Sequence, residues 1–212
     1  MYAICVPEVL AWAPALVYFA APWMQIVKNY RSHTATYAVS HRMLFIAVAG
    51  TTAKAFYDYF LIHPLAYRVM RPLTVLALLV LVGQAYWYTD DALIRQRTII
   101  TYTLFAVISA AFAVLGFAFP EVVGSVAGWV GMLALAFYQA PQVIKDYARR
   151  SVDGLSFSYL SLLCGGAVLE VMMTLILRLP IQSMLDGLRG MAYYGVFCYQ
   201  FVTYEQEETT GR

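Results

Sequence analysis

The sequence predicts an all-α integral membrane protein with seven transmembrane helices, arranged as two parallel three-helix repeats joined by a linker helix (3+1+3). Three observations lead to this fold class: 62% of the 212 residues are hydrophobic, the chain divides into seven long apolar stretches, and its two halves resemble each other. Only 12% of the residues are charged, whereas a soluble domain carries about 25%. The chain therefore lacks the polar surface that a water-soluble fold requires.

Each apolar stretch is close to the roughly 20 residues that a helix needs to cross a bilayer core. The seven stretches are 6–27, 39–61, 72–87, 99–119, 123–144, 155–177 and 184–204. They are continuously apolar, whereas the strands of a membrane β-barrel alternate over about ten residues. We therefore expect helices, the first of which stays in the mature protein, and no separate soluble domain.

Basic residues are unevenly divided between the two predicted sides of the membrane. One side carries Lys28, Arg31, Arg42, Arg95, Arg97, Lys145, Arg149, Arg150 and Arg212. The other side carries only Arg68, Arg71, Arg178 and Arg189. Because positive charge is retained in the cytosol, we expect a cytosolic C-terminus and an N-terminus that faces the outside or a lumen.

Several classes of function are disfavoured by composition. The net charge of +2 and the dispersed basic residues argue against nucleic-acid binding. The cysteines lie far apart without CxxC spacing, so neither a disulfide framework nor a metal site is expected; they are Cys5, Cys164 and Cys198. The sequence shows no nucleophile motif, phosphate loop or paired carboxylates, so we expect neither an enzyme nor a cofactor.

An internal repeat relates the two halves of the chain through two constant offsets. Trp12, Gln25, Lys28 and Tyr30 recur 117 positions later as Trp129, Gln142, Lys145 and Tyr147. Ser40, Gly50, Pro64, Gln84 and Tyr88 recur 116 positions later as Ser156, Gly166, Pro180, Gln200 and Tyr204. Such duplication is typical of transporters. It predicts a first bundle at 1–90, a linker helix at 91–120 that crosses the membrane once, and a second bundle at 121–212.

The most specific local pattern lies at the end of the fifth predicted span. Residues 140–147 read APQVIKDY, and residues 151–156 read SVDGLS. This pattern strongly resembles the PQ-loop motif, of which residues 22–31, PWMQIVKNYR, are a degenerate copy. Together with the duplication, the resemblance covers the whole chain. It points to the PQ-loop superfamily of SWEET-type sugar transporters, cystinosin-like amino-acid transporters and the related KDEL-receptor fold.

Proline and glutamine in each copy of the motif suggest a hinge. Pro22 and Pro141 each remove a backbone donor and displace a carbonyl, so kinks are expected at both. The symmetric positions of Gln25 and Gln142 make a hinge about as well supported as a role in packing alone. The resemblance implies that such kinks let the first and fifth helices bend as the bundles rock. Small residues around Gly50 and at 164–166 are expected to pack helices within each bundle.

Ionisable residues inside the predicted spans are the main candidates for solute binding or coupling. Lys54 and Glu170 are equivalent under the 116-residue offset, so pseudo-twofold symmetry is expected to set them facing each other across a central cavity. Each such charge costs at least about 2.5 kcal/mol in a membrane and needs a partner or water. The pair suits the two ends of a zwitterion, an ion pair that a solute or proton breaks, or a purely structural salt bridge. Asp58, one turn after Lys54, is a competing partner.

Polar residues of the third and seventh predicted spans complete the candidate site. Gln84 and Gln200 are expected to line the cavity, with Tyr193, Tyr194 and Cys198 lining it from the seventh span. The family's pattern is not fully kept, because the asparagines that contact sugar in SWEET-type proteins are missing from both spans. The proton-sensing aspartate that cystinosin-like proteins carry before the glycine pair of the sixth helix is also missing. Glu170 is the expected replacement if protons are coupled.

These patterns predict a transporter of a small polar solute that works by alternating access between two triple-helix bundles in a lipid bilayer. Lys54 and Glu170 favour an amino acid or a related charged metabolite. The alternatives are a SWEET-like sugar facilitator and, from another class, a KDEL-receptor-like receptor or scaffold without transport. The sequence leaves open proton coupling, the host membrane and whether the protein forms a homo-oligomer.

Overall fold

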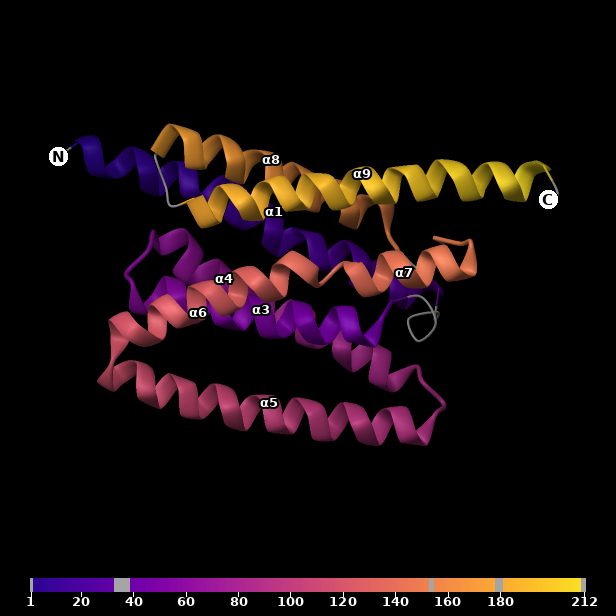
Figure 1. The fold of residues 1–212 in the computed structure, drawn as a ribbon, viewed down its shortest axis with the longest axis horizontal. Helices are drawn as coiled ribbons and strands as arrows, with labels where there is room; N and C mark the ends of the chain where they lie inside the picture. Colours follow the sequence, from indigo (N-terminus) through magenta and orange to yellow (C-terminus); the bar gives the residue numbers. More distant parts are fainter. Residues whose placement is uncertain (1, 33–38, 153–154, 178–180, 211–212) are drawn as a thin grey trace.

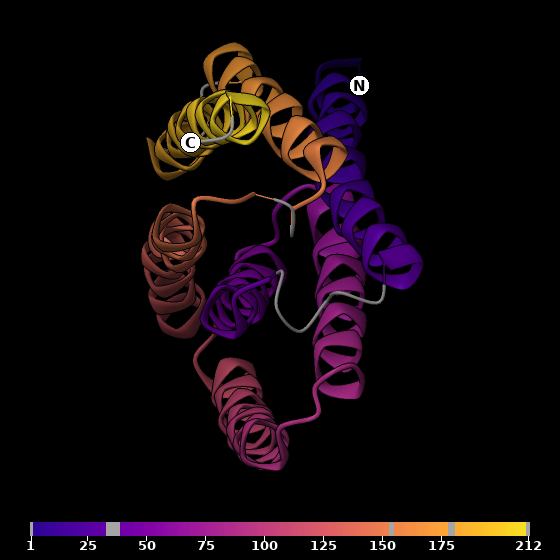
Figure 2. The same cartoon turned by 90° about the vertical axis from the view of Figure 1, so that its right-hand side faces the viewer.

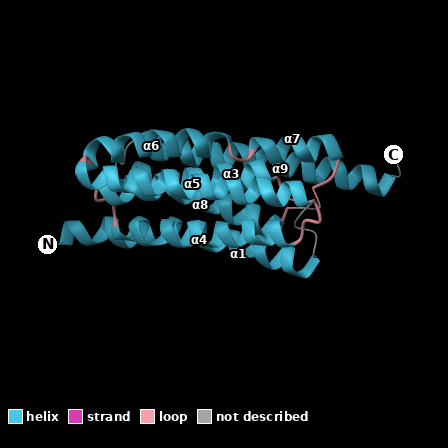
Figure 3. Cartoon of the chain, turned by 90° about the horizontal axis from the view of Figure 1, so that it is seen from below, coloured by secondary structure: helices cyan, strands magenta, loops and turns pink. Residues whose placement is uncertain are grey.

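The computed structural model describes residues 2–32, 39–152, 155–177 and 181–210, and they form eight helices (Figure 1). The helices are α1 (Tyr2–Ser32), α3 (His41–Phe60), α4 (Leu65–Trp87), α5 (Ala92–Ala118), α6 (Pro120–Phe137), α7 (Ala140–Arg149), α8 (Phe157–Leu177) and α9 (Ile181–Thr210). No strand occurs within these ranges (Figure 3). Arg178, Pro180 and Arg212 lie outside the described residues, as do positions 153–154 of the PQ-loop motif.

The eight helices make seven spans, because α6 and α7 follow each other as one segment, 120–149, that is interrupted before Pro141. Among the described residues, five segments are long and apolar enough to cross a membrane by length and composition. They are Val9–Ser32, Leu65–Trp87, Ala92–Ala118, Pro120–Arg149 and Phe157–Ile176. The more polar helices α3 and α9 complete the set. The predicted all-α fold class is confirmed.

The helices run along one common axis, and the chain begins and ends at opposite ends of the molecule (Figure 3). The third span is longer than predicted, since α4 starts at Leu65 rather than at residue 72. The apolar run begins late because Arg68 and Arg71 interrupt it, but the helix continues through both arginines and through Pro72. The two arginines therefore shifted the predicted start of the third span, but they do not end the helix in the structure.

The helices pack as two groups of three with α5 outside them. In the first group α4 packs against both α1 and α3, and in the second α9 packs against α8 and against the α6–α7 segment. The groups meet where α1 packs on α8 and where α3 packs on α6. Helix α5 lies at the edge of the molecule, away from α8 and α9 (Figures 1 and 2). We propose that residues 1–90 form the first bundle and residues 121–212 the second.

The two groups start their second helices in the same way. Ser40 caps α3 by accepting a hydrogen bond from the Met43 N–H at 3.4 Å, and Ser156 accepts one from the Tyr159 N–H at 3.3 Å. A serine at this position satisfies a backbone donor that the first helical turn leaves free. These are the serines of the 116-residue repeat, so the repeated sequence folds into a repeated local structure.

Glycines allow close approach between the two groups. A side chain at Gly50 of α3 would meet Leu135 of α6 at 2.8 Å, and one at Gly166 of α8 would meet Tyr18 of α1 at 2.9 Å. A side chain at Gly131 would meet the Gly50 carbonyl oxygen at 3.1 Å. The expectation that Gly50 and Gly166 pack helices within each bundle was therefore wrong, because both lie at the interfaces between the bundles.

The two copies of the PQ motif differ in backbone structure. Helix α1 is helical without interruption through Pro22, whereas the fifth span is interrupted at Tyr138 and Gln139 and resumes with Pro141 in the first turn of α7. Proline suits the first helical turn because its missing N–H is not needed there. A helix break thus accompanies the proline in the second copy alone.

Candidate functional site

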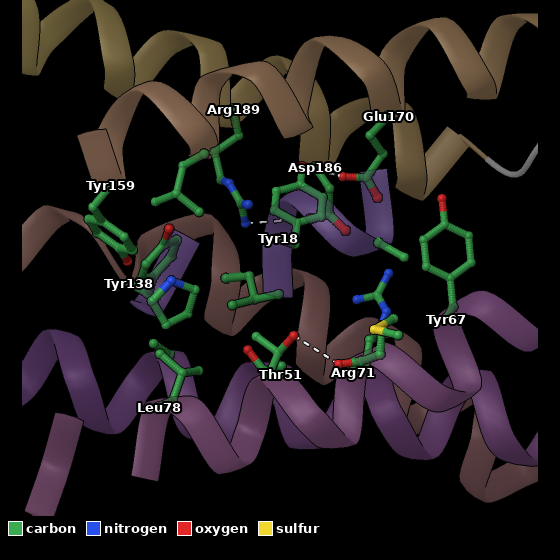
Figure 4. Close-up of a pocket in the computed structure, with 17 residues that line it drawn as sticks. Tyr18, Thr51, Tyr67, Arg71, Leu78, Tyr138, Tyr159, Glu170, Asp186 and Arg189 are labelled. Atoms are coloured by element: carbon green, nitrogen blue, oxygen red, sulfur yellow. Dashed lines mark hydrogen bonds and ion pairs between the residues drawn. The ribbon is translucent and has the colours of Figure 1, made fainter. Parts of the chain in front are cut away.

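A cavity of about 100 Å³ lies between the two bundles, and both contribute to its wall (Figure 4). Four charged side chains line it, two of each sign: Arg71, Glu170, Asp186 and Arg189. Four tyrosines add aromatic surface: Tyr18, Tyr67, Tyr138 and Tyr159. Figure 4 shows Arg71 and Glu170 towards one end of the cavity and Tyr138 and Tyr159 towards the other. Charged and aromatic groups are also in contact with each other along the wall, since Tyr67 stacks on Arg71 and Tyr138 on Arg189.

Lys54 forms an ion pair with Asp186 that links the bundles. The Lys54 Nζ lies 2.6 Å from the Asp186 Oδ2, and the two side chains are 3% and 6% exposed. Lys54 belongs to α3 and Asp186 to α9, so the bond joins the first bundle to the second. Two charges buried this deeply require each other, because removing either one leaves an uncompensated charge.

Asp58 is buried and is bound by an arginine and a histidine of its own bundle. Its Oδ2 pairs with the Arg71 Nε of α4 at 2.5 Å, and its Oδ1 lies 3.1 Å from the His63 Nδ1. Arg71 also stacks over the Tyr67 ring, with its guanidinium carbon 5.2 Å from the ring centre. Asp58 thus fixes the direction of Arg71 at the cavity wall and does not neutralise Lys54.

Glu170 is the acidic residue of the cavity wall that forms no ion pair with any residue described in the structure. It is 5% exposed and accepts a hydrogen bond from the Tyr18 hydroxyl at 2.7 Å, across the α1–α8 interface. Within the part of the chain that the structure describes, Glu170 forms no ion pair. A carboxyl in this position can hold a proton or bind a cationic group that enters the cavity.

Arg189 offers the complementary feature at the same wall. One of its terminal nitrogens lies 3.4 Å from the Asp186 Oδ1, and its guanidinium carbon is 5.6 Å from the Tyr138 ring centre. Its buried Nε has no hydrogen-bond partner among the described residues. The guanidinium therefore retains a donor, and guanidinium groups bind carboxylates well because their geometry matches.

The structure brings together a different set of charges from the one expected. Lys54 and Glu170 do lie between the bundles, but Lys54 pairs with Asp186 and not with Glu170. Asp186, Arg71 and Arg189 were not expected at the site. The sequence did contain a signal for Asp186 and Arg189, since both fall inside the predicted span 184–204, although Arg189 was counted with the basic residues of the non-cytosolic side. Arg71 was placed just before the predicted span 72–87.

The repeated glutamines lie outside the cavity wall. Gln84 donates to the Ile26 carbonyl at 3.1 Å, and Gln200 donates to the Val143 carbonyl at 3.0 Å. Each bond ties the third helix of a bundle to its first, so the expected role of Gln84 and Gln200 in lining the cavity is corrected to a role in bundle structure. Both acceptors lie next to the PQ glutamines, Gln25 and Gln142.

The three candidates from the seventh span also lie off the cavity wall. Tyr193 donates its hydroxyl to the Ala136 carbonyl at 3.1 Å, which ties α9 to α6. Tyr194 lies near Cys198 and Cys164, where α8 and α9 pack together. None of the three candidates is among the residues that line the cavity described above. The sequence identified the correct helix for them, but the helix face that meets the cavity carries Asp186 and Arg189 instead.

Gln25 and Gln142 connect the bundles reciprocally. The Gln25 Oε1 accepts the Ser156 backbone N–H at 2.8 Å, and the Gln142 Oε1 accepts the Ser40 backbone N–H at 2.7 Å. Both glutamines are fully buried, at 1% and 0% exposure. Each PQ glutamine therefore binds the backbone at the start of the second helix of the opposite bundle.

Comparison with known proteins supports this architecture. The family model of the PQ loop repeat matches residues 123–183. Among solved structures, a eukaryotic SWEET transporter determined at 3.7 Å matches with a TM-score of 0.66 and 16% sequence identity, over 95% of this chain and 99% of that one. No curated protein sequence matches the chain. The chain thus contains a PQ loop repeat in its second half and shares the seven-helix fold of a SWEET transporter.

Proposed function

We propose that the protein is a transporter that carries a small zwitterionic solute, an amino acid or a related charged metabolite, across a membrane. The observation that carries the proposal is the cavity between the bundles, which is lined by two cations and two anions. Charges are costly inside a membrane protein and mark solute or ion pathways there. A formally neutral set of charges favours a solute that is itself neutral overall and charged at both ends.

Two groups of the wall have capacity to bind such a solute. Glu170 accepts one hydrogen bond from Tyr18 and forms no ion pair with any described residue, so its carboxyl suits an ammonium group. Arg189 keeps a buried Nε donor without a partner in the described residues, so it suits a carboxylate. The solute then lies in the cavity between the bundles and contacts α8 and α9, with the tyrosines of the wall against its apolar part.

The reciprocal contacts of Gln25 and Gln142 suit two bundles that move against each other as units. Each contact joins the motif of one bundle to the other bundle at a buried point, and the break before Pro141 gives the fifth span a place to bend. The fold shared with a SWEET transporter supports alternating access as the mechanism. The proposed protein catalyses no reaction, lies in a lipid bilayer and has its C-terminus in the cytosol.

A sugar is the second candidate solute. The structural match is to a SWEET transporter, and four tyrosines line the cavity. Aromatic faces and hydrogen-bonding side chains together suit a sugar ring. Sugar carries no ammonium group, so replacing the Glu170 carboxylate separates the two candidates.

Uptake by proteoliposomes tests the proposal. The purified protein should move a labelled amino acid down its gradient, and Glu170→Gln should reduce the rate at least about tenfold, since an ion pair of this kind contributes about 1.5–3 kcal/mol. Glu121→Gln is the matched control, because Glu121 is exposed at the start of α6. Movement of sugar alone would support the second candidate, and binding without movement would support a receptor.

A further inference from the structure

The first bundle contains a continuous chain of four side-chain hydrogen bonds around its PQ glutamine. The Ser156 N–H donates to the Gln25 Oε1 at 2.8 Å, and the Gln25 Nε2 donates to the Asn29 Oδ1 at 2.7 Å. The Asn29 Nδ2 then donates to the Gln84 Oε1 at 3.3 Å, and the Gln84 Nε2 donates to the Ile26 carbonyl at 3.1 Å. Every link has one donor and one acceptor.

The second bundle repeats three of these four links. The Ser40 N–H donates to the Gln142 Oε1 at 2.7 Å, and the Gln142 Nε2 donates to the Asp146 Oδ1 at 2.7 Å. The last link also recurs, because the Gln200 Nε2 donates to the Val143 carbonyl at 3.0 Å. The third link, between Asp146 and Gln200, is missing. Asp146 takes the place of Asn29 under the 117-residue offset.

The two atoms that would make the missing link are both buried and unbonded. The Asp146 Oδ2 and the Gln200 Oε1 have no hydrogen-bond partner in the described residues, and each residue is 3% exposed. Both atoms are acceptors when the carboxyl is ionised, so they cannot bond to each other. In the first bundle the amide of Asn29 supplies the donor at this point. One proton on the Asp146 Oδ2 would supply it in the second.

We propose that Asp146 is a proton-binding site, which takes a proton from water on its Oδ2 and donates it in a hydrogen bond to the Gln200 Oε1. The chain of the second bundle is then complete and equals that of the first. Without the proton, two buried acceptor oxygens remain unsatisfied, and such groups are costly. The proton therefore stabilises the contact between α7 and α9.

The charged and titratable groups around Asp146 influence whether its carboxyl is protonated. On its own helix, Lys145 and Arg149 are the charged neighbours, and both favour the ionised carboxyl. Helix α3 brings His41 near Lys145. Helix α9 brings the uncharged Gln200, which binds the Val143 carbonyl on the same helix as Asp146. Burial and the missing donor favour the protonated carboxyl, whereas the two cations and the hydrogen bond from Gln142 favour the ionised one.

The protonation state is connected directly to the interface between the bundles. Asp146 holds the Gln142 Nε2, and the Oε1 of the same amide accepts the Ser40 N–H of the other bundle. Gain or loss of the proton therefore changes a group that is one hydrogen bond away from the interface. The proposal does not depend on transport, since stability and infrared spectra of the full protein report it without any solute.

Thermal unfolding of the full protein in detergent, between about pH 4.5 and about pH 8, tests the proposal. In the wild type the proton is bound more tightly by the folded state, so stability is highest at low pH and falls as the site loses its proton. Asp146→Asn places a permanent donor at the site and should raise the melting temperature at the high pH by about 2–4 °C. The drop in melting temperature with pH should shrink by the same amount.

Asn29→Asp is the matched control, because it creates the same missing donor in the first bundle. This variant should gain a comparable drop in melting temperature as the pH rises. An unchanged drop in Asp146→Asn, or none gained in Asn29→Asp, would overturn the proposal.

Infrared difference spectra give a second readout if either variant unfolds. Lowering the pH should produce the C=O stretch of a buried protonated carboxyl in the wild type, and Gln200→Leu should shift this band because it removes the acceptor. A band that Gln200→Leu leaves in place would contradict the assignment to Asp146.

Discussion

The two bundles share a hydrogen-bond framework but differ in charge. Gln25 and Gln142 make equivalent bonds to the opposite bundle, and the serine caps and the glutamines of the third helices also repeat. At the positions around the cavity, by contrast, Lys54 is matched by Glu170 under the 116-residue offset. The remaining charged positions are matched by uncharged residues: Asp58 by Thr174, Arg71 by Gly187, Asp186 by Met70, and Arg189 by Leu73. The framework is therefore symmetric except where Asp146 replaces Asn29, and the cavity that it encloses is not symmetric.

This difference matches two requirements of the transporter that we propose. Two bundles that rock against each other need equivalent contacts at their interface, so the structural residues repeat. A solute with two unlike ends needs unlike groups around it, so the binding residues do not repeat. Changes at equivalent positions of the two bundles can therefore test which residues belong to the framework and which belong to the site.

The largest expected effect is at the asymmetric pair of equivalent positions. Lys54→Met leaves Asp186 buried without its closest cation and should lower the free energy of unfolding by about 3–5 kcal/mol. Glu170→Gln keeps an acceptor for Tyr18 and breaks no ion pair within the described residues, so it should cost less than about 1 kcal/mol. Thermal unfolding of both variants checks the difference. Equal costs at the two positions would contradict the assigned pairing.

The next effect concerns the symmetric framework. Gln25→Leu and Gln142→Leu each leave a serine N–H of the bundle interface without its acceptor, which should cost about 1–3 kcal/mol in each case. The two costs should agree closely, because the bonds are equivalent. Gln139→Leu is the control, since Gln139 is buried but its Oε1 has no hydrogen-bond partner in the described residues. A loss of stability at one PQ glutamine and none at the other would contradict the equivalence of the two bonds.

The smallest effect is at two adjacent glycines of α8. Gly166→Ala places a methyl group 2.9 Å from the Tyr18 ring at the bundle interface and should cost about 1–3 kcal/mol. Gly165→Ala meets nothing within 4 Å, so it should stabilise the helix by about 0.5–1 kcal/mol. Melting temperatures of the two variants should therefore move in opposite directions. A shift in the same direction would place the interface elsewhere on α8.

Much of the fold could be predicted because its signals are local or periodic. Apolar length predicts the spans, and constant offsets predict the repeat, including the equivalence of Gln25 and Gln142. The pairing of charges could not be predicted in this way. Lys54, Asp186 and Arg71 lie on three different helices, so their partners depend on which helix faces meet in the folded protein.

The role of the repeated glutamines shows the same limit. A polar residue near the end of a span is equally consistent with a cavity wall and with a bond to a neighbouring helix. Gln84 and Gln200 bind carbonyls of the PQ helices at 3.1 and 3.0 Å. These partners could not be predicted from the sequence. Sequence periodicity indicates the face of a helix, but the target of that face is set by tertiary packing.

Counterflow in proteoliposomes is the most direct test of a symmetric framework around a zwitterion site. Vesicles loaded with an unlabelled amino acid should accumulate the labelled amino acid transiently above its external concentration, because a carrier exchanges solute across one alternating site. Glu170→Gln should abolish this accumulation, and Glu121→Gln should leave it intact. Labelled solute that only equilibrates with the outside, or accumulation that survives Glu170→Gln, would contradict the account.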